Sequence, residues 1–395
     1  MRVLLVSSGS GSRGGGEIFL EYLAKELTGR GHEVMVWIPE APRMDELAAK
    51  CARDANVIRS NYRNTYDYST RSLATCFNWS VSRRIAEEWR TIAPDVIHIN
   101  KQNLEDGLDL LRAVRLCALP SICTVHLTQT ASYLRAKLAS LRDFIARRQL
   151  EKYEGIIVSV QATREQALRE FIGNRACTAT VLNGVPWLDM AAMGSERQRK
   201  RVELGVSDGE LLVLGVGRLV AQKRPLLFLK IAKELHAQVP QTRFLWVGDG
   251  DLAPQWRETI ARDQMGDFVS CAGWQSDVQP FFLAGDVLLH VAEFEALPFV
   301  LIEAMAARLA CAVTRDLASE LSFLDEENVM YVDDPSELAR KLANKETVAK
   351  LAMAGWKLAK DTLSIGRMAQ EYEQLYRMAI EKRTSASAPR GQPSA

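Results

Sequence analysis

The chain has 395 residues, 47% of them hydrophobic and 25% charged, with a formal net charge of +1. Such a composition is typical of a globular protein, the length favours two domains, and the charge argues against a broad nucleic-acid surface. Seven cysteines form no C-x-x-C pair and five histidines do not cluster, so neither a disulfide framework nor a zinc site is predicted. No apolar stretch reaches the roughly 20 residues of a membrane span, so we expect a cytoplasmic protein.

A glycine-rich loop follows the first predicted strand, which covers residues 3–6. The loop has the spacing G-x-G-x-x-G at Gly9, Gly11 and Gly14, which after a strand is typical of a dinucleotide site. It continues as Gly14-Gly15-Gly16-Glu17 into a predicted helix, and glycines there let the backbone approach a ligand closely. A solvated loop without a ligand is the simpler alternative.

Two histidines stand at the carboxyl ends of predicted strands. His98 lies near the end of the strand at 95–99, and His126 directly follows the strand at 121–125. Ligands of open α/β sheets bind at this edge, so both histidines are candidates for a binding site. The alternative, above all for His98, is a packed histidine whose hydrogen bonds are satisfied.

Residues 132–152 have the pattern of an amphipathic helix surrounded by six basic residues. We expect most of its apolar stripe to belong to the core; the stripe comprises Leu134, Leu138, Leu141 and Ile145. A basic helix of this kind can alternatively rest on an anionic membrane surface. Strands and helices alternate up to about residue 183, where Asn-Gly and Pro break the pattern, which predicts a first doubly wound domain.

The second half opens with a charged run at 195–201, which we expect to be solvated. A predicted strand at 211–216 then leads to a predicted helix at 225–238, and Arg218 and Lys223 lie on the loop between them. Two fixed cations at a helix N-terminus can neutralise the charge that grows on a departing diphosphate without a metal ion. Each alone would be an ordinary surface cation, but the pair predicts a phosphate site.

Two further stretches carry acidic residues directly after predicted strands. Asp249 and Asp251 follow Gly248 with the D-x-D spacing of a metal site, but their place after the strand at 244–247 predicts a turn. Residues 293–307 read EFEALPFVLIEAMAA and open a helix with Pro298 in its first turn. Glu295 precedes this helix and Glu303 lies about one and a half turns into it, so both carboxylates can face one ligand at the helix N-terminus.

Three stretches in this order carry a resemblance to a known family: the Gly-Gly-x-Glu loop at Gly14–Glu17, G-R-L followed by a lysine at Arg218 and Lys223, and E-x7-E at Glu295 and Glu303. The chain resembles the retaining glycosyltransferases of family 4, which have the GT-B fold, over nearly its whole length. The resemblance implies that cations and the glycine loop hold the donor diphosphate, that the second glutamate binds the ribose, and that the first glutamate and a histidine lie near the sugar. The implied catalytic residues are His126, Arg218, Lys223 and Glu295; the implied donor-binding residues are Gly14, Gly15, Gly16, Arg218, Lys223, Gly248, Leu297, Pro298 and Glu303.

The implied architecture is α/β: a GT-B fold of two Rossmann-like, doubly wound parallel-sheet domains facing a central cleft. We expect an acceptor-side domain at 1–185, a nucleotide-sugar donor domain at 186–364, a helix crossing back to the first domain at 365–383, and a disordered tail at 384–395.

The implied activity is hexosyl transfer, with retention and without metal or other cofactor, from a UDP- or GDP-sugar to an acceptor hydroxyl. By the resemblance, the hydroxyl attacks from the face that the leaving diphosphate occupies, and a phosphate oxygen takes its proton. The implied acceptor is a saccharide, glycolipid or small molecule in glycan, polysaccharide or glycolipid biosynthesis. A lipid acceptor implies peripheral contact with the inner face of the membrane, and nucleic acid is not an expected partner.

The chain departs from the family pattern at three positions. Ala296, Arg308 and Ala310 stand where the family usually has Gly, Gly and Pro, so the helix that begins near Pro298 can end differently. These departures keep open the alternative of a catalytically silent nucleotide-sugar-binding partner protein. Two further alternatives are a GT-B sugar-nucleotide epimerase or hydrolase, and an NAD-dependent oxidoreductase that rests on Gly9-x-Gly11 alone.

Overall fold

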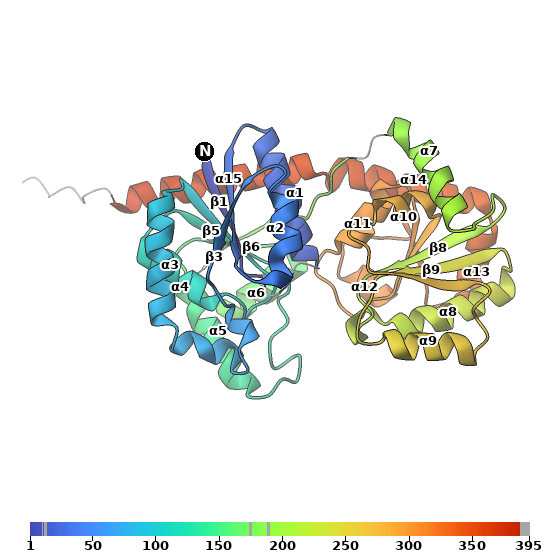
Figure 1. The fold of residues 1–395 in the computed structure, drawn as a ribbon, viewed down its shortest axis with the longest axis horizontal. Coiled ribbons are helices and arrows are strands. Elements are labelled where there is room, and N and C mark those ends of the chain that lie inside the picture. The colour runs from blue at the N-terminus through green and yellow to red at the C-terminus, as the bar shows by residue number, and fades with distance from the viewer. Residues whose placement is uncertain (10, 12–13, 174–175, 188–189, 388–395) are drawn as a thin grey trace, which may run out of the picture. The chain divides into compact units, whose positions relative to one another are not determined.

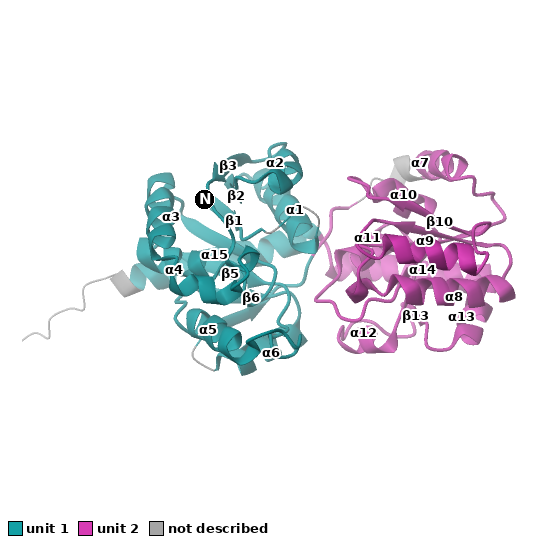
Figure 2. Cartoon of the chain, turned by 60° about the horizontal axis from the view of Figure 1, so that its bottom comes forward, with its two compact units in different colours: residues 1–183, 365–395 teal, residues 184–364 magenta. Residues whose placement is uncertain are grey.

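The chain forms two compact units, each with its own parallel sheet (Figures 1 and 2). Unit 1 comprises Met1–Asn183 and Ile365–Ala395, and unit 2 comprises Gly184–Ser364. The computed structural model describes residues 1–9, 11, 14–173, 176–187 and 190–387. Both sheets have helices between successive strands, so the predicted fold class of two Rossmann-like domains is confirmed.

Unit 1 is built on a seven-stranded sheet in the order β3-β2-β1-β4-β5-β6-β7. Its strands are β1 (Arg2–Ser7), β2 (Glu33–Pro39), β3 (Asn56–Ser60), β4 (Val96–Lys101), β5 (Ser121–Val125), β6 (Ile156–Ser159) and β7 (Cys177–Thr180). Its helices are α1 (Gly15–Gly29), α2 (Asp45–Cys51), α3 (Trp79–Ile92), α4 (Leu108–Cys117), α5 (Ala139–Glu151), α6 (Ala162–Ile172) and α15 (Ile365–Ser387), with short 3-10 turns η1 (Pro42–Met44), η2 (Thr65–Asp67) and η3 (Arg71–Cys76). The central strand β1 is buried from Val3 to Ser7, which explains why residues 3–6 read as a continuous apolar run.

Unit 2 is built on a six-stranded sheet in the order β10-β9-β8-β11-β12-β13. Its strands are β8 (Leu211–Val216), β9 (Thr242–Val247), β10 (Val269–Gly273), β11 (Val287–His290), β12 (Ala310–Val313) and β13 (Val329–Tyr331). Its helices are α7 (Met190–Glu203), α8 (Pro225–Gln238), α9 (Ala253–Arg262), α10 (Gln279–Ala284), α11 (Phe299–Ala306), α12 (Arg315–Ser319), α13 (Pro335–Ala343) and α14 (Lys345–Thr362), with the 3-10 turn η4 (Ala221–Lys223). In each sheet the strand order reverses once, between β1 and β4 in unit 1 and between β8 and β11 in unit 2.

Helix α15 is fixed to unit 1 by buried polar contacts between aromatic side chains and the sheet. His98 of β4 hydrogen-bonds through Nδ1 to the Tyr376 hydroxyl (2.8 Å) and through Nε2 to Thr124 (2.8 Å), and Thr124 also contacts the Tyr372 hydroxyl (2.9 Å). Both imidazole nitrogens therefore have partners. His98 is a packed residue that joins α15 to the sheet, as the alternative interpretation of the sequence predicted.

Three expectations about individual segments are wrong. The helix expected over 132–152 begins only at Ala139, because Arg135 and Leu138 adopt left-handed backbone angles (φ 51° and 54°) that interrupt it. Residues 384–387 are helical within α15 and not part of a tail, while 388–395 lie outside the described residues. In the charged run, Arg201 is buried and binds Asp286 (3.0 Å) and the Ala284 carbonyl (3.0 Å), so it is not solvated.

Burial of His98 predicts a specific loss of stability in acid. Burial, together with the nearby His126, lowers the pKa of His98 to about 3 from its usual 6.5. Between pH 6.5 and pH 3, His98 is therefore protonated in the unfolded chain but neutral in the folded chain. The contribution of His98 to the unfolding free energy is fully present above pH 6.5. It decreases by about 1.4 kcal/mol for each pH unit below 6.5, so about 2 kcal/mol is lost at pH 5. Urea unfolding at pH 7 and pH 5 measures this effect. Between these pH values, the unfolding free energy of unit 1 should decrease by about 2 kcal/mol less in His98→Gln than in wild type. Equal decreases contradict the assignment.

Candidate functional site

The residues predicted to bind phosphate and sugar in unit 2 lie where the strand order of its sheet reverses. Lys223 and Arg218 follow β8, and Glu295 follows β11, the strand that pairs directly with β8. Open α/β sheets bind ligands outside the carboxyl ends of their strands at such a reversal, because the two following loops diverge there. The fold thus brings together residues that are 72 positions apart in the sequence.

An ion pair joins these two loops. The Lys223 ammonium contacts Glu295 Oε1, and both side chains are largely buried, with 16% and 12% of their surfaces exposed. Gln222 strengthens the junction on either side: its carbonyl accepts from the Glu293 backbone N–H (2.8 Å), and its amide donates to the Phe294 carbonyl (3.0 Å). Separating the two groups would leave an uncompensated charge in a largely buried place, which is unfavourable. Lys223 and Glu295 therefore keep each other in position.

His290, the last residue of β11, lies behind this ion pair. Its Nε2 is 3.8 Å from Glu295 Oε1, and the side chain is only 4% exposed. Burial, together with the neighbouring Lys223 charge, lowers the pKa of His290 to about 4, so the imidazole is neutral at pH 7. His290 therefore adds no positive charge beside the Lys223–Glu295 ion pair at pH 7.

Arg218 differs from Lys223 in its surroundings. Its side chain is exposed and makes no hydrogen bond or ion pair to any residue within the described parts of the chain. The guanidinium is thus available to an anion that arrives beside Lys223.

Gly217 and Gly248 let the loops after β8 and β9 cross at close range. A Cβ on Gly248 would lie 2.0 Å from the Gly217 carbonyl oxygen, and both glycines have positive φ (143° and 138°). Asp249 follows as an exposed residue whose carboxylate accepts from the Gly250 N–H (2.8 Å), and its carbonyl accepts from the Leu219 N–H (3.0 Å). Of the D-x-D segment, Asp251 lies in a turn, as predicted, and Asp249 precedes that turn.

Helix α11 carries the second glutamate of the E-x7-E motif. The helix begins at Phe299, so Pro298 is its N-cap residue and not part of its first turn, and Leu297 is buried beneath it. Glu303 is the fifth residue of the helix and is half-buried. The N-cap has no capping side chain, which suits an N-terminus that receives an anion.

Arg308 ends α11 in the way a glycine would. It adopts φ 63°, its N–H donates to the Met305 carbonyl (3.0 Å), and the next N–H, of Leu309, donates to Ala304 (2.9 Å). This is the hydrogen-bond pattern of a Schellman motif, and the Arg308 guanidinium lies 4.7 Å from the centre of the Trp356 ring. The departure from glycine therefore does not lengthen the helix or displace Glu303.

In unit 1 the candidate residues also gather where the strand order reverses. Gly14 is the N-cap of α1, and Gly15 and Gly16 begin that helix after β1. The Asn100 amide at the end of β4 donates to the Gly16 carbonyl (2.8 Å) and its oxygen contacts His126 Nε2 (2.7 Å). Nε2 is therefore the protonated nitrogen of His126 and Nδ1 is an acceptor, since burial lowers the pKa of this histidine to about 4 and keeps it neutral.

Sequence reasoning missed three residues of these sites: Asn100, Gln222 and His290. Asn100 and His290 are polar residues at the carboxyl ends of β4 and β11, which is the signal that could have identified them, and Gln222 lies beside Lys223 in η4, the turn after β8. Local sequence patterns do not show which strands are neighbours in a sheet. The contacts of Asn100 with Gly16 and of Gln222 with the Glu295 loop could therefore not be predicted.

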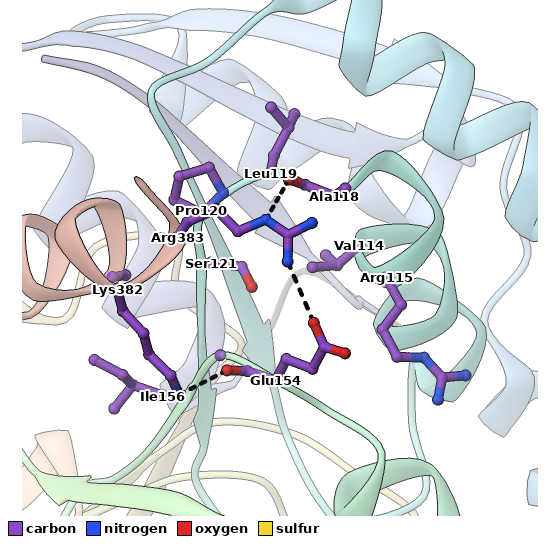
Figure 3. A pocket seen from close by; sticks show the side chains of 12 residues that line it. Val114, Arg115, Ala118, Leu119, Pro120, Ser121, Glu154, Ile156, Lys382 and Arg383 are labelled. Atoms are coloured by element: carbon purple, nitrogen blue, oxygen red, sulfur yellow. Dashed lines mark hydrogen bonds and ion pairs between the residues drawn. The ribbon is translucent and has the colours of Figure 1, made fainter. Parts of the chain in front are cut away.

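A hollow of about 100 Å³ in unit 1 lies at the opposite, amino edge of the sheet (Figure 3). Ser121 and Ile156, the first residues of β5 and β6, line it. Its cations are engaged: Lys382 donates to the Glu154 carbonyl (2.9 Å), and Arg383 donates to the Ala118 carbonyl (2.9 Å). This hollow is separate from the sites described above.

No helix in the described part of the chain is both long and apolar enough for a membrane span.

Comparisons with known proteins agree with this arrangement. The family model described as Glycosyltransferase Family 4 matches residues 13–186, and the model described as Glycosyl transferases group 1 matches residues 210–345. The alpha-monoglucosyldiacylglycerol synthase of Acholeplasma laidlawii is 23% identical over 333 residues, 81% of this chain and 81% of that protein. An Escherichia coli enzyme, UDP-Gal:alpha-D-GlcNAc-diphosphoundecaprenol alpha-1,3-galactosyltransferase, is 25% identical over 228 residues, 56% of this chain and 57% of that protein, so the chain spans little more than half of that relative.

Solved structures share the fold. HepE of Anabaena in complex with UDP-glucose has a TM-score of 0.73 at 17% identity, covering 98% of this chain and 100% of that one. Sucrose-phosphate synthase of Thermosynechococcus elongatus has a TM-score of 0.74 at 18% identity, covering 97% and 100%. The fold, the family models and these relatives identify a GT-B glycosyltransferase, an enzyme of the hexosyltransferase type. The chain belongs to family 4 of the glycosyltransferases, since the two family models together span well over half of it.

The close crossing at Gly248 predicts that this glycine is indispensable to unit 2. In Gly248→Ala the new methyl group meets the Gly217 carbonyl oxygen and the residue keeps an unfavourable φ, so we expect a loss of about 3 kcal/mol or more in the unfolding free energy of unit 2. Gly266→Ala is the matched control, because nothing lies within 4 Å of its added methyl group. Urea unfolding followed by tryptophan fluorescence measures both, and equal stability of the two variants contradicts the crossing.

Proposed function

We propose that this enzyme transfers a hexosyl group from a UDP-sugar to an acceptor hydroxyl, with retention of the anomeric configuration and without a metal ion. The observation that carries the proposal is the pair of cations after β8: the exposed Arg218 side chain has no hydrogen-bond or ion-pair partner among the described residues, and Lys223 is held by Glu295 of the neighbouring loop. HepE with bound UDP-glucose and the UDP-Gal-dependent galactosyltransferase support UDP as the nucleotide, with GDP as the alternative.

The two cations stabilise the leaving diphosphate. A diphosphate beside Lys223 competes with Glu295 for the ammonium, while the guanidinium of Arg218 binds the second phosphate in fork geometry. As the bond between sugar and diphosphate breaks, negative charge grows on the leaving oxygen, and fixed cations neutralise it without reorganisation. When Lys223 contacts the diphosphate in place of Glu295, the Glu295 carboxylate can accept hydrogen bonds from sugar hydroxyls.

Glu303 is proposed to bind the ribose hydroxyls from the first turns of α11, whose N-terminus, at Leu297 and Pro298, favours the negative charge of the phosphates. Gly248 lets the backbone of its loop lie close to the nucleotide. His126 and the loop Gly14, Gly15 and Gly16 stay predictions for contacts with the donor sugar and phosphates, respectively.

The acceptor hydroxyl attacks the anomeric carbon on the face from which the diphosphate departs. The new bond forms between the hydroxyl oxygen and the anomeric carbon, the bond to the phosphate oxygen breaks, and a diphosphate oxygen receives the hydroxyl proton. This order of events retains the configuration and needs no protein nucleophile.

The acceptor is proposed to be a glycan or glycolipid of a biosynthetic pathway, for which two relatives offer support. The name of one specifies a sugar on diphosphoundecaprenol as its acceptor, and the name of the other specifies a glycolipid, monoglucosyldiacylglycerol, as its product. A lipid acceptor places the enzyme peripherally at the inner face of the membrane, and a soluble saccharide acceptor leaves it in the cytoplasm.

Kinetics of two variants test the proposal. Arg218→Ala should lower kcat by about 100-fold, because the arginine acts on charge that develops only in the transition state. Glu303→Ala should instead raise the KM for the UDP-sugar about tenfold with a smaller change in kcat, because ribose contacts are made equally before and during transfer. UDP release from UDP-glucose and UDP-galactose measures both, with the exposed Arg262→Ala of α9 as control.

Product analysis accompanies these rates. Proton NMR should show an α-linked product from an α-linked donor; a β-linked product overturns retention. Free hexose or an isomerised donor without an acceptor product favours the hydrolase or epimerase, and donor binding without turnover favours the silent partner protein. Wild-type kinetics in both variants contradict the assigned roles.

A further inference from the structure

Exposed apolar side chains gather in unit 1 between β5 and the first turns of α5. Figure 1 labels both elements. Five of the twelve exposed large hydrophobic side chains of the described residues fall within positions 133–144. They are Tyr133 (64% exposed), Leu134 (47%), Leu138 (66%), Leu141 (47%) and Phe144 (58%). The expectation that Leu134, Leu138 and Leu141 belong to the core is therefore wrong, and only Ile145 of that stripe is buried. We call the five residues the 133–144 surface.

This surface is held in shape by the rest of unit 1. The Asp143 carboxylate accepts from the backbone N–H groups of Ala131 (2.7 Å) and Ser132 (3.0 Å) and from the Ser132 hydroxyl (2.6 Å). Arg142 binds both oxygens of Glu105 (2.8 and 2.6 Å), which ties the start of α5 to the loop after β4. The apolar side chains thus project from an ordered turn, and burying them elsewhere needs little further ordering.

The charge around the 133–144 surface is strongly positive. Residues 131–152 hold six basic and two acidic side chains, a formal charge of +4 in a chain whose total is +1. Arg135 and Lys137 flank the apolar residues and are exposed, and Arg147 and Arg148 share the single acid Glu151 (2.9 and 3.3 Å). A second copy of the chain docked on this surface would bring like charges together, whereas an anionic lipid surface is attracted to both the cations and the apolar side chains.

The position of the surface relates it to the candidate site. Its first residue, Tyr133, lies seven positions beyond His126, which directly follows β5, so the segment leaves the sheet at the same carboxyl edge as the residues gathered around Asn100. Exposed Phe77 (83%) follows η3, which packs on α5 through the hydrogen bond from Ser72 to the Arg142 carbonyl (3.4 Å). Aromatic and apolar side chains therefore extend along this edge from two connecting segments.

We propose that the 133–144 surface docks the enzyme on an anionic membrane, with its leucines and aromatic rings in the interface and the basic residues on the lipid headgroups. The inference rests on the proposed function in one respect: it names a bilayer-borne molecule as the acceptor class. Docking at this edge brings such an acceptor to the side of unit 1 that carries His126.

Vesicle co-sedimentation of the full chain tests the docking. Wild type should sediment with phosphatidylglycerol–phosphatidylcholine vesicles but not with pure phosphatidylcholine, and 1 M salt should weaken the binding because it shortens the screening length to about 3 Å. Leu138→Asp/Leu141→Asp should lower the partition coefficient at least tenfold. Met353→Asp, at a residue 46% exposed on α14 of unit 2, is the control and should bind like wild type.

Two outcomes overturn the proposal: wild type that ignores anionic vesicles, and a double variant that binds them as wild type does. Sedimentation velocity without lipid gives a third, because a wild-type dimer that the double variant converts to monomer reassigns the surface to a second copy. UDP affinity should be unchanged in the double variant, which shows that its fold is intact. Vesicle binding without any sugar transfer would reject the proposed function alone, and transfer without vesicle binding would reject the docking alone.

Discussion

The arrangement of unit 2 depends on one electrostatic constraint: a lysine and a carboxylate, both largely buried, must neutralise each other across two loops. Lys223 and Glu295 satisfy it, and Gln222 secures the junction with backbone contacts on either side. Because β8 and β11 are neighbours at the strand-order reversal, the pair sits where a ligand enters the edge of the sheet. In the proposed function, a phosphate that draws Lys223 away also releases Glu295, so this ion pair would couple recognition of the diphosphate to recognition of the sugar.

Local patterns predicted much of this architecture. The strand at 211–216 and the helix at 225–238 match β8 and α8 residue for residue, because a buried apolar run and a proline at the helix start are strong local signals. The placement of Arg218 and Lys223 on one loop followed from the same reasoning. That Lys223 pairs with Glu295 did not, since the pairing depends on which strand lies beside β8, and strand order is a tertiary property.

The errors share a physical origin. A leucine stripe has the same period whether it faces a core or solvent, and the left-handed residues Arg135 and Leu138, which delay the start of the expected helix to Ala139, have no local sequence signal. Arg201 was expected in water, but the Ala284 carbonyl at the end of α10 and the Asp286 carboxylate accept hydrogen bonds from its buried guanidinium. Arg308 shows the reverse: the fold keeps a glycine-type helix end although the residue is an arginine, so the departure from the family pattern leaves the geometry of α11 intact.

The measurement that tests the central claim most directly is a thermal-shift panel of the full chain with UDP, GDP, ADP, dTDP and NAD, each with EDTA and with magnesium. A ligand at 100 times its Kd stabilises the folded state by about 2.7 kcal/mol. The proposed site predicts a rise in Tm with UDP that EDTA does not alter and that Lys223→Met removes. A rise with NAD instead, a rise that requires magnesium, or a UDP response unaffected by Lys223→Met would contradict a metal-independent diphosphate site after β8.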